Sequence, residues 1–304
     1  MSGWQRTRVY RNHHLDSTRW DAIDSRDDDV VITTSYKSGT TWTQGIVGNL
    51  LLRDVPDAPP LMAASPWVDA RFAMPLEQLV AALKAQTHRR FLKSHLAADG
   101  LMYRPTTRYI VVGRDPRDVF MSLVNHYGGY TDLALSMFND DPSLPPFPRF
   151  DGDVRKLWRG WITRGSFEWE TEGFPWWGNL RHTASYWPYR DLENVMFLHY
   201  GDLKADVAGE VRRIAAFLGL ALDDAEVATV VRESDIDRMR AIAEQEGGTL
   251  GSFFDGGAKR FFFKGTNGRW RDVLDADDLA LYEAAKQRVL EPACAQWLEH
   301  GYRG

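Results

Sequence analysis

The chain has 304 residues, which is enough for one large α/β domain with a full core or for two smaller domains. Hydrophobic residues make up 44% and charged residues 26%, as in an ordinary soluble globular protein. The net charge of −5 gives no reason to expect nucleic acid or an anionic membrane as a partner, so an anionic ligand needs a local basic cluster.

Cysteine usage and hydropathy indicate the compartment. Cys294 is the only cysteine and cannot form an internal disulfide, which suits a reducing environment, and on its amphipathic segment it is most simply a core residue. The N-terminal stretch has no apolar segment of signal-peptide length, and no segment approaches the ~18 apolar residues of a membrane span. We therefore expect a cytoplasmic protein that does not span a membrane.

The first predicted strand leads into a loop that is typical of phosphate binding. Residues 1–29 are polar and are expected to wrap the surface before this strand, Val30-Val31-Ile32, and a helix is predicted from Thr41 to Leu52. The connecting sequence is Thr33-Thr34-Ser35-Tyr36-Lys37-Ser38-Gly39-Thr40. In such a turn, backbone N–H groups and the positive end of the helix dipole point at one place, where Lys37 adds a full charge. The loop is not a Walker A motif, because Lys37 precedes the only glycine, Gly39.

The remaining elements alternate between strands and helices. Strands are predicted at 91–96, 108–113 and 194–200. Asp115 can cap the helix that starts at Pro116, and Gly128-Gly129 ends it. Further helices are predicted at about 75–86, 207–218, 223–233 and 276–294. We see no internal repeat and no linker, so residues 1–304 are predicted to form one α/β domain whose central parallel sheet is flanked by helices.

Two irregular segments interrupt this alternation. Residues 130–180 form an aromatic insert with five tryptophans, which is either a lid over a ligand site or part of the core. Residues 245–268 are rich in glycine and aromatic residues, and the stretch is too long for a simple connector, so we expect a functional loop.

Polar residues follow each predicted strand at its C-terminal end, where open parallel sheets bind ligands. These residues are Lys37 to Trp42 after the first strand, Lys93 and His95 at the second, Arg114 with Ser122 after the third, and Tyr200 after the fourth. Alone, His95 would more often be a structural histidine, and Arg114 beside Asp115 could be a local salt bridge. His126 and His199 are interpreted as residues of a helix face and a strand interior.

Several of these segments together resemble the cytosolic-type sulfotransferases, which use 3′-phosphoadenosine 5′-phosphosulfate (PAPS). Residues 33–42 are similar to the family's T-Y-P-K-S-G-T-T-W loop, with Tyr36 in place of the proline. Lys93-Ser94-His95 is similar to K-T-H, and Arg114 to Asp118 with Ser122 is similar to R-N-P-K-D…S. Lys264-Gly265 to Trp270 is similar to the K-G-x-x-G-x-W signature. The resemblance covers about residues 28–275 in motif order and implies a P-loop-like, nucleotide-kinase-like fold.

The resemblance implies sulfuryl transfer from PAPS to a hydroxyl group, with no metal. His95 is then the general base, Lys37 stabilises the charge on the leaving oxygen, and Lys93 holds the sulfuryl oxygens. The residues implied for PAPS binding are Lys37, Ser38, Gly39, Thr40, Thr41, Trp42, Arg114, Ser122, Tyr200, Ser234, Lys264 and Gly265. The acceptor expected from the aromatic insert is an apolar small molecule such as a phenol, an alcohol or a glycolipid.

The sequence departs from the family pattern at three places. Phe263 stands where the family has an arginine that helps to hold the 3′-phosphate, and Lys259, Arg260 and Lys264 are the candidates to replace it. Ile236 replaces the aromatic residue beside the adenine, which leaves Trp42 as the expected stacking partner. The family's dimerisation segment reads Asp275 to Ala280 here, so a homodimer is possible but the usual dimer motif is not matched.

Two other functions remain open from the sequence. A P-loop nucleotide kinase shares the strand–loop–helix cradle, but the position of Lys37 and the lack of a recognisable Walker B carboxylate count against it. A non-enzymatic nucleotide-binding protein on the same fold is supported only by the loss of arginine at Phe263.

Overall fold

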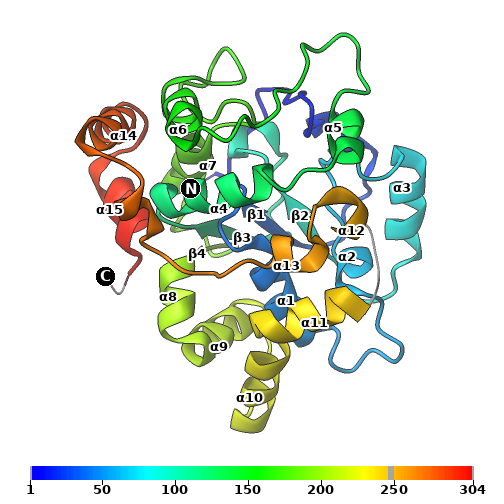
Figure 1. Cartoon of the computed structure of the whole chain (residues 1–304). Coiled ribbons are helices and arrows are strands. Elements are labelled where there is room, and N and C mark those ends of the chain that lie inside the picture. Colours follow the sequence, from blue (N-terminus) through cyan, green and yellow to red (C-terminus); the bar gives the residue numbers. More distant parts are fainter. Residues whose placement is uncertain (1, 246–249, 303–304) are drawn as a thin grey trace.

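The computed structural model describes residues 2–245 and 250–302 and is built on one parallel sheet (Figure 1). The strands are β1 (Val30–Thr34), β2 (Phe91–Ser94), β3 (Arg108–Gly113) and β4 (Val195–His199), in the order β2-β1-β3-β4. All three pairings are parallel, and Val30 lies opposite both Phe91 and Arg108. The predicted α/β fold with a central parallel sheet flanked by helices is therefore confirmed.

Helices cover both faces of the sheet because successive side chains of a strand point to opposite faces. Val30 and Ile32 of β1 belong to an aliphatic core with helices α1 (Thr40–Leu51), α9 (Val207–Phe217) and α10 (Asp224–Glu233). Val31 of β1, with Tyr109 of β3 and Phe197 of β4, belongs to a larger aromatic core. That second core is completed by α4 (Pro116–Tyr127), α6 (Val154–Thr163), α7 (Asn179–Tyr186) and α15 (Pro292–His300).

The other elements are short connections and peripheral helices. They are η1 (Ser17–Ala22), α2 (Leu61–Ala64), α3 (Leu76–Ala85), η2 (Ala98–Gly100), α5 (Asp132–Phe138), η3 (Trp187–Tyr189), α8 (Tyr200–Ala205), α11 (Ile236–Gln245), α12 (Leu250–Phe253), α13 (Gly257–Phe261), η4 (Arg269–Asp272) and α14 (Ala276–Val289). The predicted cap of α4 is present, since the Asp115 carboxylate accepts a hydrogen bond from the backbone N–H of Arg117.

Two predictions about the chain ends were wrong. The single helix predicted for 276–294 is two helices, because Pro292 has no N–H to continue α14 and the chain turns at extended Leu290. The N-terminal segment does not only wrap the surface, since Trp4, Tyr10 and Leu15 are buried in the aromatic core. The Trp4 ring packs 4.7 Å from the ring of Tyr109, centroid to centroid, so this segment closes one face of the sheet.

The aromatic insert contributes mainly core residues. Trp158 and Trp161 on α6 are fully buried, and Trp176 and Trp177 are nearly so. The indole N–H of Trp158 donates to the carbonyl oxygen of Asp278 on α14, at 3.0 Å. Of the four, Trp177 has a ring that reaches the end of β2, where its centroid lies 5.6 Å from that of His95.

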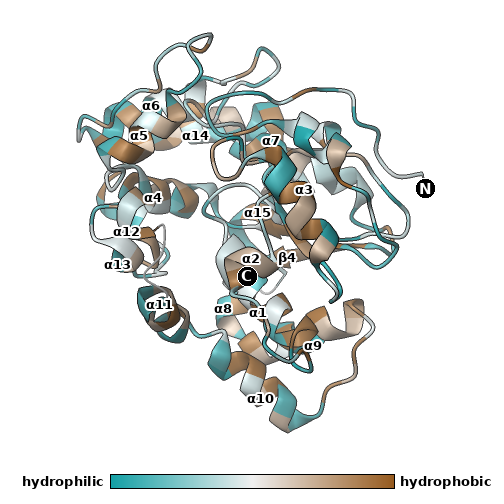
Figure 2. Cartoon of the chain, turned by 90° about the vertical axis from the view of Figure 1, so that its right-hand side faces the viewer, coloured by the Kyte–Doolittle hydropathy of each residue, from teal (hydrophilic) through white to brown (hydrophobic). Residues whose placement is uncertain are grey.

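The expected functional loop at 245–268 holds two short helices, α12 and α13, and residues 246–249 lie outside the described residues. Figures 1 and 2 show α12 and α13 beside α4, with α11, which precedes them in the chain, next to α13. Near the start of α4, Asp118 accepts a hydrogen bond from the N–H of Gly268, and near its end Asn125 donates to the carbonyl of Arg260. The segment from Arg260 to Gly268 therefore runs along α4 and forms one wall of the candidate active site.

Candidate active site

The loop after β1 presents its lysine through an unusual backbone conformation. Lys37 has φ of 60°, which a non-glycine residue seldom adopts, and Gly39 has φ of 105° and caps the N-terminus of α1. Ser38 is fully buried, and its hydroxyl lies 2.7 Å from that of Ser35, while the hydroxyl of Thr40 lies 2.6 Å from that of Thr34. The side chains of Ser38 and Thr40 thus brace the loop from inside, which leaves its backbone and Lys37 to meet a ligand.

Tyr36 occupies the place of the family proline and ties the loop to the aromatic insert. Its hydroxyl accepts a hydrogen bond from the indole N–H of Trp161 at 2.5 Å. Its ring meets the Trp177 ring edge-on, with centroids 4.9 Å apart. The insert therefore supports the phosphate-binding loop directly.

Three cationic side chains converge at the carboxyl ends of β1, β2 and β3, as predicted from the sequence. They are those of Lys37, Lys93 and Arg114. Burial, followed by the charges of Arg114 and Lys93, lowers the pKa of Lys37 to about 7. Burial lowers the pKa of Lys93 to about 8, with Asp69 opposing the shift. Within the described residues, none of the three forms an ion pair. Arg114 is buried and the two lysines are partly buried, and uncompensated cations in such places are costly, so this cluster is chemically suited to an anionic ligand.

Arg114 is held rigidly, yet one of its N–H groups is unused. Its guanidinium donates to the carbonyl oxygen of Lys37 at 3.2 Å and to the side-chain oxygen of Asn267 at 2.8 Å. Its Cζ lies 4.1 Å from the centroid of the Tyr200 ring. Its Nε is buried and has no partner in the described parts of the chain. Asp115 pairs with Arg117 instead, so the alternative of a local Arg114–Asp115 salt bridge is wrong.

His95 lies directly after β2 and is 4% exposed. Its Nδ1 lies 2.8 Å from the carbonyl oxygen of Thr34, and because a carbonyl only accepts, Nδ1 must carry the proton. Nε2 is then an unprotonated acceptor, and it makes no hydrogen bond to any residue that the structure describes. Burial, followed by the charge of Lys93, holds the pKa of His95 well below its usual range. A neutral imidazole with a free Nε2 is the form that a general base requires.

Trp67 and Asp69, of which the sequence reasoning did not single out Asp69, fix the surroundings of His95. The Asp69 carboxylate accepts from the backbone N–H of His95 at 3.0 Å and from the indole N–H of Trp67 at 2.7 Å. The Trp67 ring lies edge-on to His95 at 4.8 Å and carries the Lys93 ammonium at 4.5 Å from its centroid. This one carboxylate therefore positions both His95 and the ring beneath the Lys93 ammonium.

The C-terminal motif, Lys264 to Trp270, lies against Tyr200 at the start of α8. The Tyr200 hydroxyl donates to the carbonyl oxygen of Gly265 at 3.2 Å, and the Trp42 ring packs edge-on against Tyr200 at 5.6 Å. Gly265 has φ of 59°, a conformation that favours glycine. Lys264 is exposed, and its Nζ lies 5.7 Å from the Phe263 ring. Lys37, Arg114, Tyr200, Trp42 and Gly265 are thus brought together.

Three predicted binding residues lie less centrally. Ser122 is on α4, one turn before His126, and is partly exposed. Thr41 is partly exposed on the first turn of α1. Ser234 is fully buried at the end of α10, and its hydroxyl accepts a hydrogen bond from Asn49 of α1 at 3.2 Å. The Ser234 side chain therefore already has a protein partner.

Arg269 was missed by the sequence reasoning and lies over the residue that replaces the family arginine. Its Cζ is 5.2 Å from the centroid of the Phe263 ring, and its Nε is buried without a partner among the described residues. Its charge acts on Arg114 and lowers the pKa of that group further. Arg260 instead donates to Asn125 and to the carbonyl of Gly128, at the other end of α4. The comparison with the K-G-x-x-G-x-W motif did not point to Arg269, because it is the turn at Gly268 that brings Arg269 close to Phe263.

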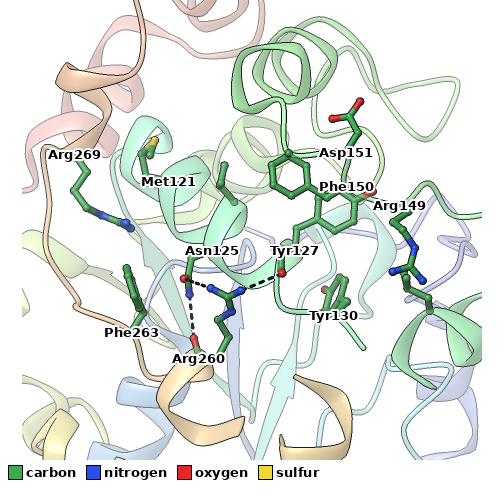
Figure 3. A pocket seen from close by; sticks show the side chains of 14 residues that line it. Met121, Asn125, Tyr127, Tyr130, Arg149, Phe150, Asp151, Arg260, Phe263 and Arg269 are labelled. Carbon is green, nitrogen blue, oxygen red and sulfur yellow. Dashed lines mark hydrogen bonds between the residues drawn. The ribbon is translucent and has the colours of Figure 1, made fainter. Parts of the chain in front are cut away.

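Arg260, Phe263 and Arg269 border a cavity of about 640 Å³ that lies over α4, whereas Lys37, His95 and Arg114 do not line it (Figure 3). Met121 and Asn125 of α4 form its floor, Phe150 and Arg149 one side, and Arg260, Phe263 and Arg269 the other. In the described ranges 2–245 and 250–302, no three His, Cys, Asp or Glu side chains gather as metal ligands would, and no helix is long and apolar enough to cross a membrane.

Solved structures that resemble this one include a sulfotransferase and retinol dehydratase. A mouse sulfotransferase, SULT7A1, complexed with PAP superposes with a TM-score of 0.67 and 18% identity, covering 93% of this chain and 92% of the other. Retinol dehydratase, in complex with androsterone and inactive cofactor PAP, also has a TM-score of 0.67, with 22% identity and coverage of 90% and 84%. At these identities the likeness establishes the fold.

Sequence comparisons establish the family. A glycolipid sulfotransferase of Mycobacterium bovis is 34% identical over 315 residues, covering 97% of this chain and 95% of its relative. Human sulfotransferase 2B1 is 29% identical over 276 residues, covering 88% and 67% of the two chains. The family described as "Sulfotransferase domain" matches residues 27–292. The basic cradle and the neutral histidine therefore belong to an enzyme of the sulfotransferase family.

Proposed function

We propose that this enzyme transfers the sulfuryl group of PAPS to a hydroxyl group of an apolar acceptor, with His95 as the general base. One observation carries the proposal: a neutral histidine with a free Nε2 lies beside partly buried lysines that form no ion pair among the described residues. The family match and the PAP found in the similar solved structures support the choice of donor.

The residues present fit a nucleotide with two anionic ends. The loop backbone and Lys37 would hold the 5′ end, and Arg114, whose Nε is buried without a partner in the described chain, would hold the 3′-phosphate with Ser122 and Gly265. Trp42 would lie against the adenine. When bound, the nucleotide supplies the sulfuryl group, and Lys93 and Lys37 would stabilise the charge on the transferred and the leaving oxygens. His95 Nε2 would accept the proton of the acceptor hydroxyl.

Arg269 would supply the guanidinium that the family places at Phe263. It is close enough for its charge to act on Arg114, and its Nε is likewise buried and unpartnered within the described residues. Of the three candidates from the sequence, Arg260 is already engaged with α4, and Lys259 and Lys264 are exposed.

The surroundings of His95 favour an apolar acceptor. Ring contacts run outward from His95 through Trp67 and Phe72 to Phe253, each pair of centroids lying 4.8–5.6 Å apart. Trp177 lies on another side of His95, at 5.6 Å. Such walls bind flat or extended apolar groups. The relative from Mycobacterium bovis is a glycolipid sulfotransferase, so a glycolipid stands with phenols and hydrophobic alcohols among the acceptors to test. We place the reaction in the cytoplasm, and a homodimer stays possible.

Calorimetry and turnover together test the function. The protein should bind adenosine 3′,5′-bisphosphate much more tightly than ADP or ATP and without added Mg²⁺. It should also transfer radiolabelled sulfate from PAPS to at least one member of a panel of glycolipids, phenols and hydrophobic alcohols. Equal binding of ATP would contradict the donor assignment, and tight donor binding without transfer to a hydroxyl would contradict the acceptor assignment.

A further inference from the structure

His126, which the sequence reasoning treated as an ordinary residue of a helix face, contacts the lysine of the phosphate-binding loop. Its Nδ1 lies 3.2 Å from the Nζ of Lys37. The imidazole sits on the last turn of α4 and is surrounded by three aromatic rings, those of Tyr130 at 5.2 Å, Phe254 at 4.5 Å and Phe261 at 6.0 Å. These contacts from the loop after α4, from the residue after α12 and from α13 fix the plane of the ring.

The proton positions in this contact follow from the charges around it. Burial is the largest cause, followed by the charges of Lys37 and Lys93 and by the nearby imidazoles of His14 and His95, and together they hold the pKa of His126 well below its usual range. The charged groups with the largest effect on His126 are lysines, histidines also act on it, and the titratable Tyr130 packs against its ring. The imidazole is therefore neutral, and its Nδ1 accepts a hydrogen bond from the Lys37 ammonium while Nε2 carries the proton.

Lys37 needs such a partner because its other neighbours repel it. Arg114 and Lys93 both act unfavourably on its charge. A lysine side chain is long and flexible, so repulsion and entropy would both turn the ammonium group away from the cluster. Across the described residues, Nδ1 of His126 is the single hydrogen-bond partner recorded for Nζ, and the Phe261 ring adds a contact at 5.2 Å.

We infer that His126 is a positioning residue for Lys37: its Nδ1 holds the ammonium group at the place where the donor cradle meets the aromatic surroundings of the acceptor. The inference rests on the proposed role of Lys37 in sulfuryl transfer. A hydrogen bond that ends on a neutral acceptor also favours the charged form of Lys37, so His126 keeps this lysine protonated at higher pH than the other neighbours would allow.

Two variants separate this role from packing. His126→Phe keeps a ring among Tyr130, Phe254 and Phe261 but removes the acceptor, and His126→Asn restores an acceptor atom near the position of Nδ1. At saturating donor and acceptor, His126→Phe should lower kcat about ten- to a hundredfold, as expected for loss of a hydrogen bond to a charged group. The alkaline limb of its pH–rate profile should move to lower pH, and His126→Asn should recover most of both effects.

A double-variant cycle with Lys37→Ala tests whether His126 acts through Lys37. His126→Phe should have little further effect on kcat once Lys37 is alanine, because the two changes remove the same interaction. The inference is overturned if the two losses multiply, or if His126→Phe changes only the KM of the acceptor and leaves the pH profile in place.

A measurement without turnover keeps this test apart from the proposed function. In ¹⁵N-labelled full-length protein at neutral pH, the NMR shifts of His126 should show a neutral ring protonated on Nε2, and Lys37→Ala should shift the Nδ1 resonance. A protonated Nδ1, or no response to Lys37→Ala, would overturn the inference even in a fully active enzyme. If the NMR result holds but no sulfuryl transfer is found, the proposed function fails and the contact stands.

Discussion

Replacing His95 by asparagine should remove the general base and leave the site otherwise intact. The asparagine amide can still donate to the carbonyl oxygen of Thr34, which Nδ1 of His95 does at 2.8 Å, but it offers no basic nitrogen at the position of Nε2. Positioned general bases typically contribute ~10²–10⁴ to rate, so kcat should fall by that factor. The affinity for adenosine 3′,5′-bisphosphate should change little, since a neutral imidazole adds no charge to the donor site.

His95→Ala is the matched control for structure. It loses the same base but also leaves the Thr34 carbonyl without its donor and opens a space between Trp67 and Trp177, whose rings lie 4.8 and 5.6 Å from that of His95. An unsatisfied buried acceptor costs ~1–3 kcal/mol, so the alanine variant should unfold at lower urea concentration than the asparagine variant. The two variants should nevertheless have similar kcat.

The pH dependence gives an independent reading. Because the pKa of His95 lies well below its usual range, its basic form persists as the pH falls, and wild-type kcat should stay level below pH ~6.5. Activity should be lost only when the pH falls through that lowered pKa. The assay is steady-state transfer of radiolabelled sulfate at saturating donor. A His95→Asn enzyme with kcat within tenfold of wild type, or a wild-type acidic limb centred near pH 6.5, would refute the assignment.

Three other predictions test the donor cradle, the substituted arginine and the aromatic insert. The pKa of Lys37 in the free protein is about 7, and an anion binds the charged form of this lysine. The affinity for adenosine 3′,5′-bisphosphate should therefore fall as the pH rises from 7 to 9, and calorimetry should show that binding takes up protons. Proton release on binding would contradict this prediction. Arg269→Ala should weaken binding of this nucleotide about tenfold or more relative to binding of AMP. Adding Phe263→Arg to the same chain should restore the affinity. An equal loss of affinity for AMP would show that Arg269 does not contact the 3′-phosphate. Trp177→Ala should raise the KM of the acceptor more than the KM of the donor, because the Trp177 ring lies beside His95. Trp158→Ala should lower the free energy of unfolding by ~3–5 kcal/mol without altering acceptor preference in the folded fraction. The reverse pattern would make Trp158 the residue that lines the acceptor pocket and Trp177 the core residue.

The local features of this protein could be read from its sequence, because they depend on neighbours in the chain. Runs such as Val30-Val31-Ile32 predicted the strands, and Asp115 with Pro116 predicted the start of α4, since burial periodicity and capping act over a few residues. The polar ends of parallel strands must meet at one edge of a sheet, so the convergence of Lys37, Lys93 and Arg114 followed from the same reasoning. The break at Pro292 was also present in the sequence and was overlooked.

Contacts between distant segments were decided only by the tertiary structure. The Nδ1 proton of His95 depends on the Thr34 carbonyl, 61 residues away, and the hydrogen bond from Lys37 to His126 spans 89 residues. Arg269 lies over Phe263 because Gly268 adopts a left-handed turn and Asp118 anchors its N–H. The residue type determines which chemistry a side chain can perform. Its protonation state and its hydrogen-bond partners depend on which atoms the folded chain places within about 3 Å of it, and the spacing of residues along the sequence does not encode that distance.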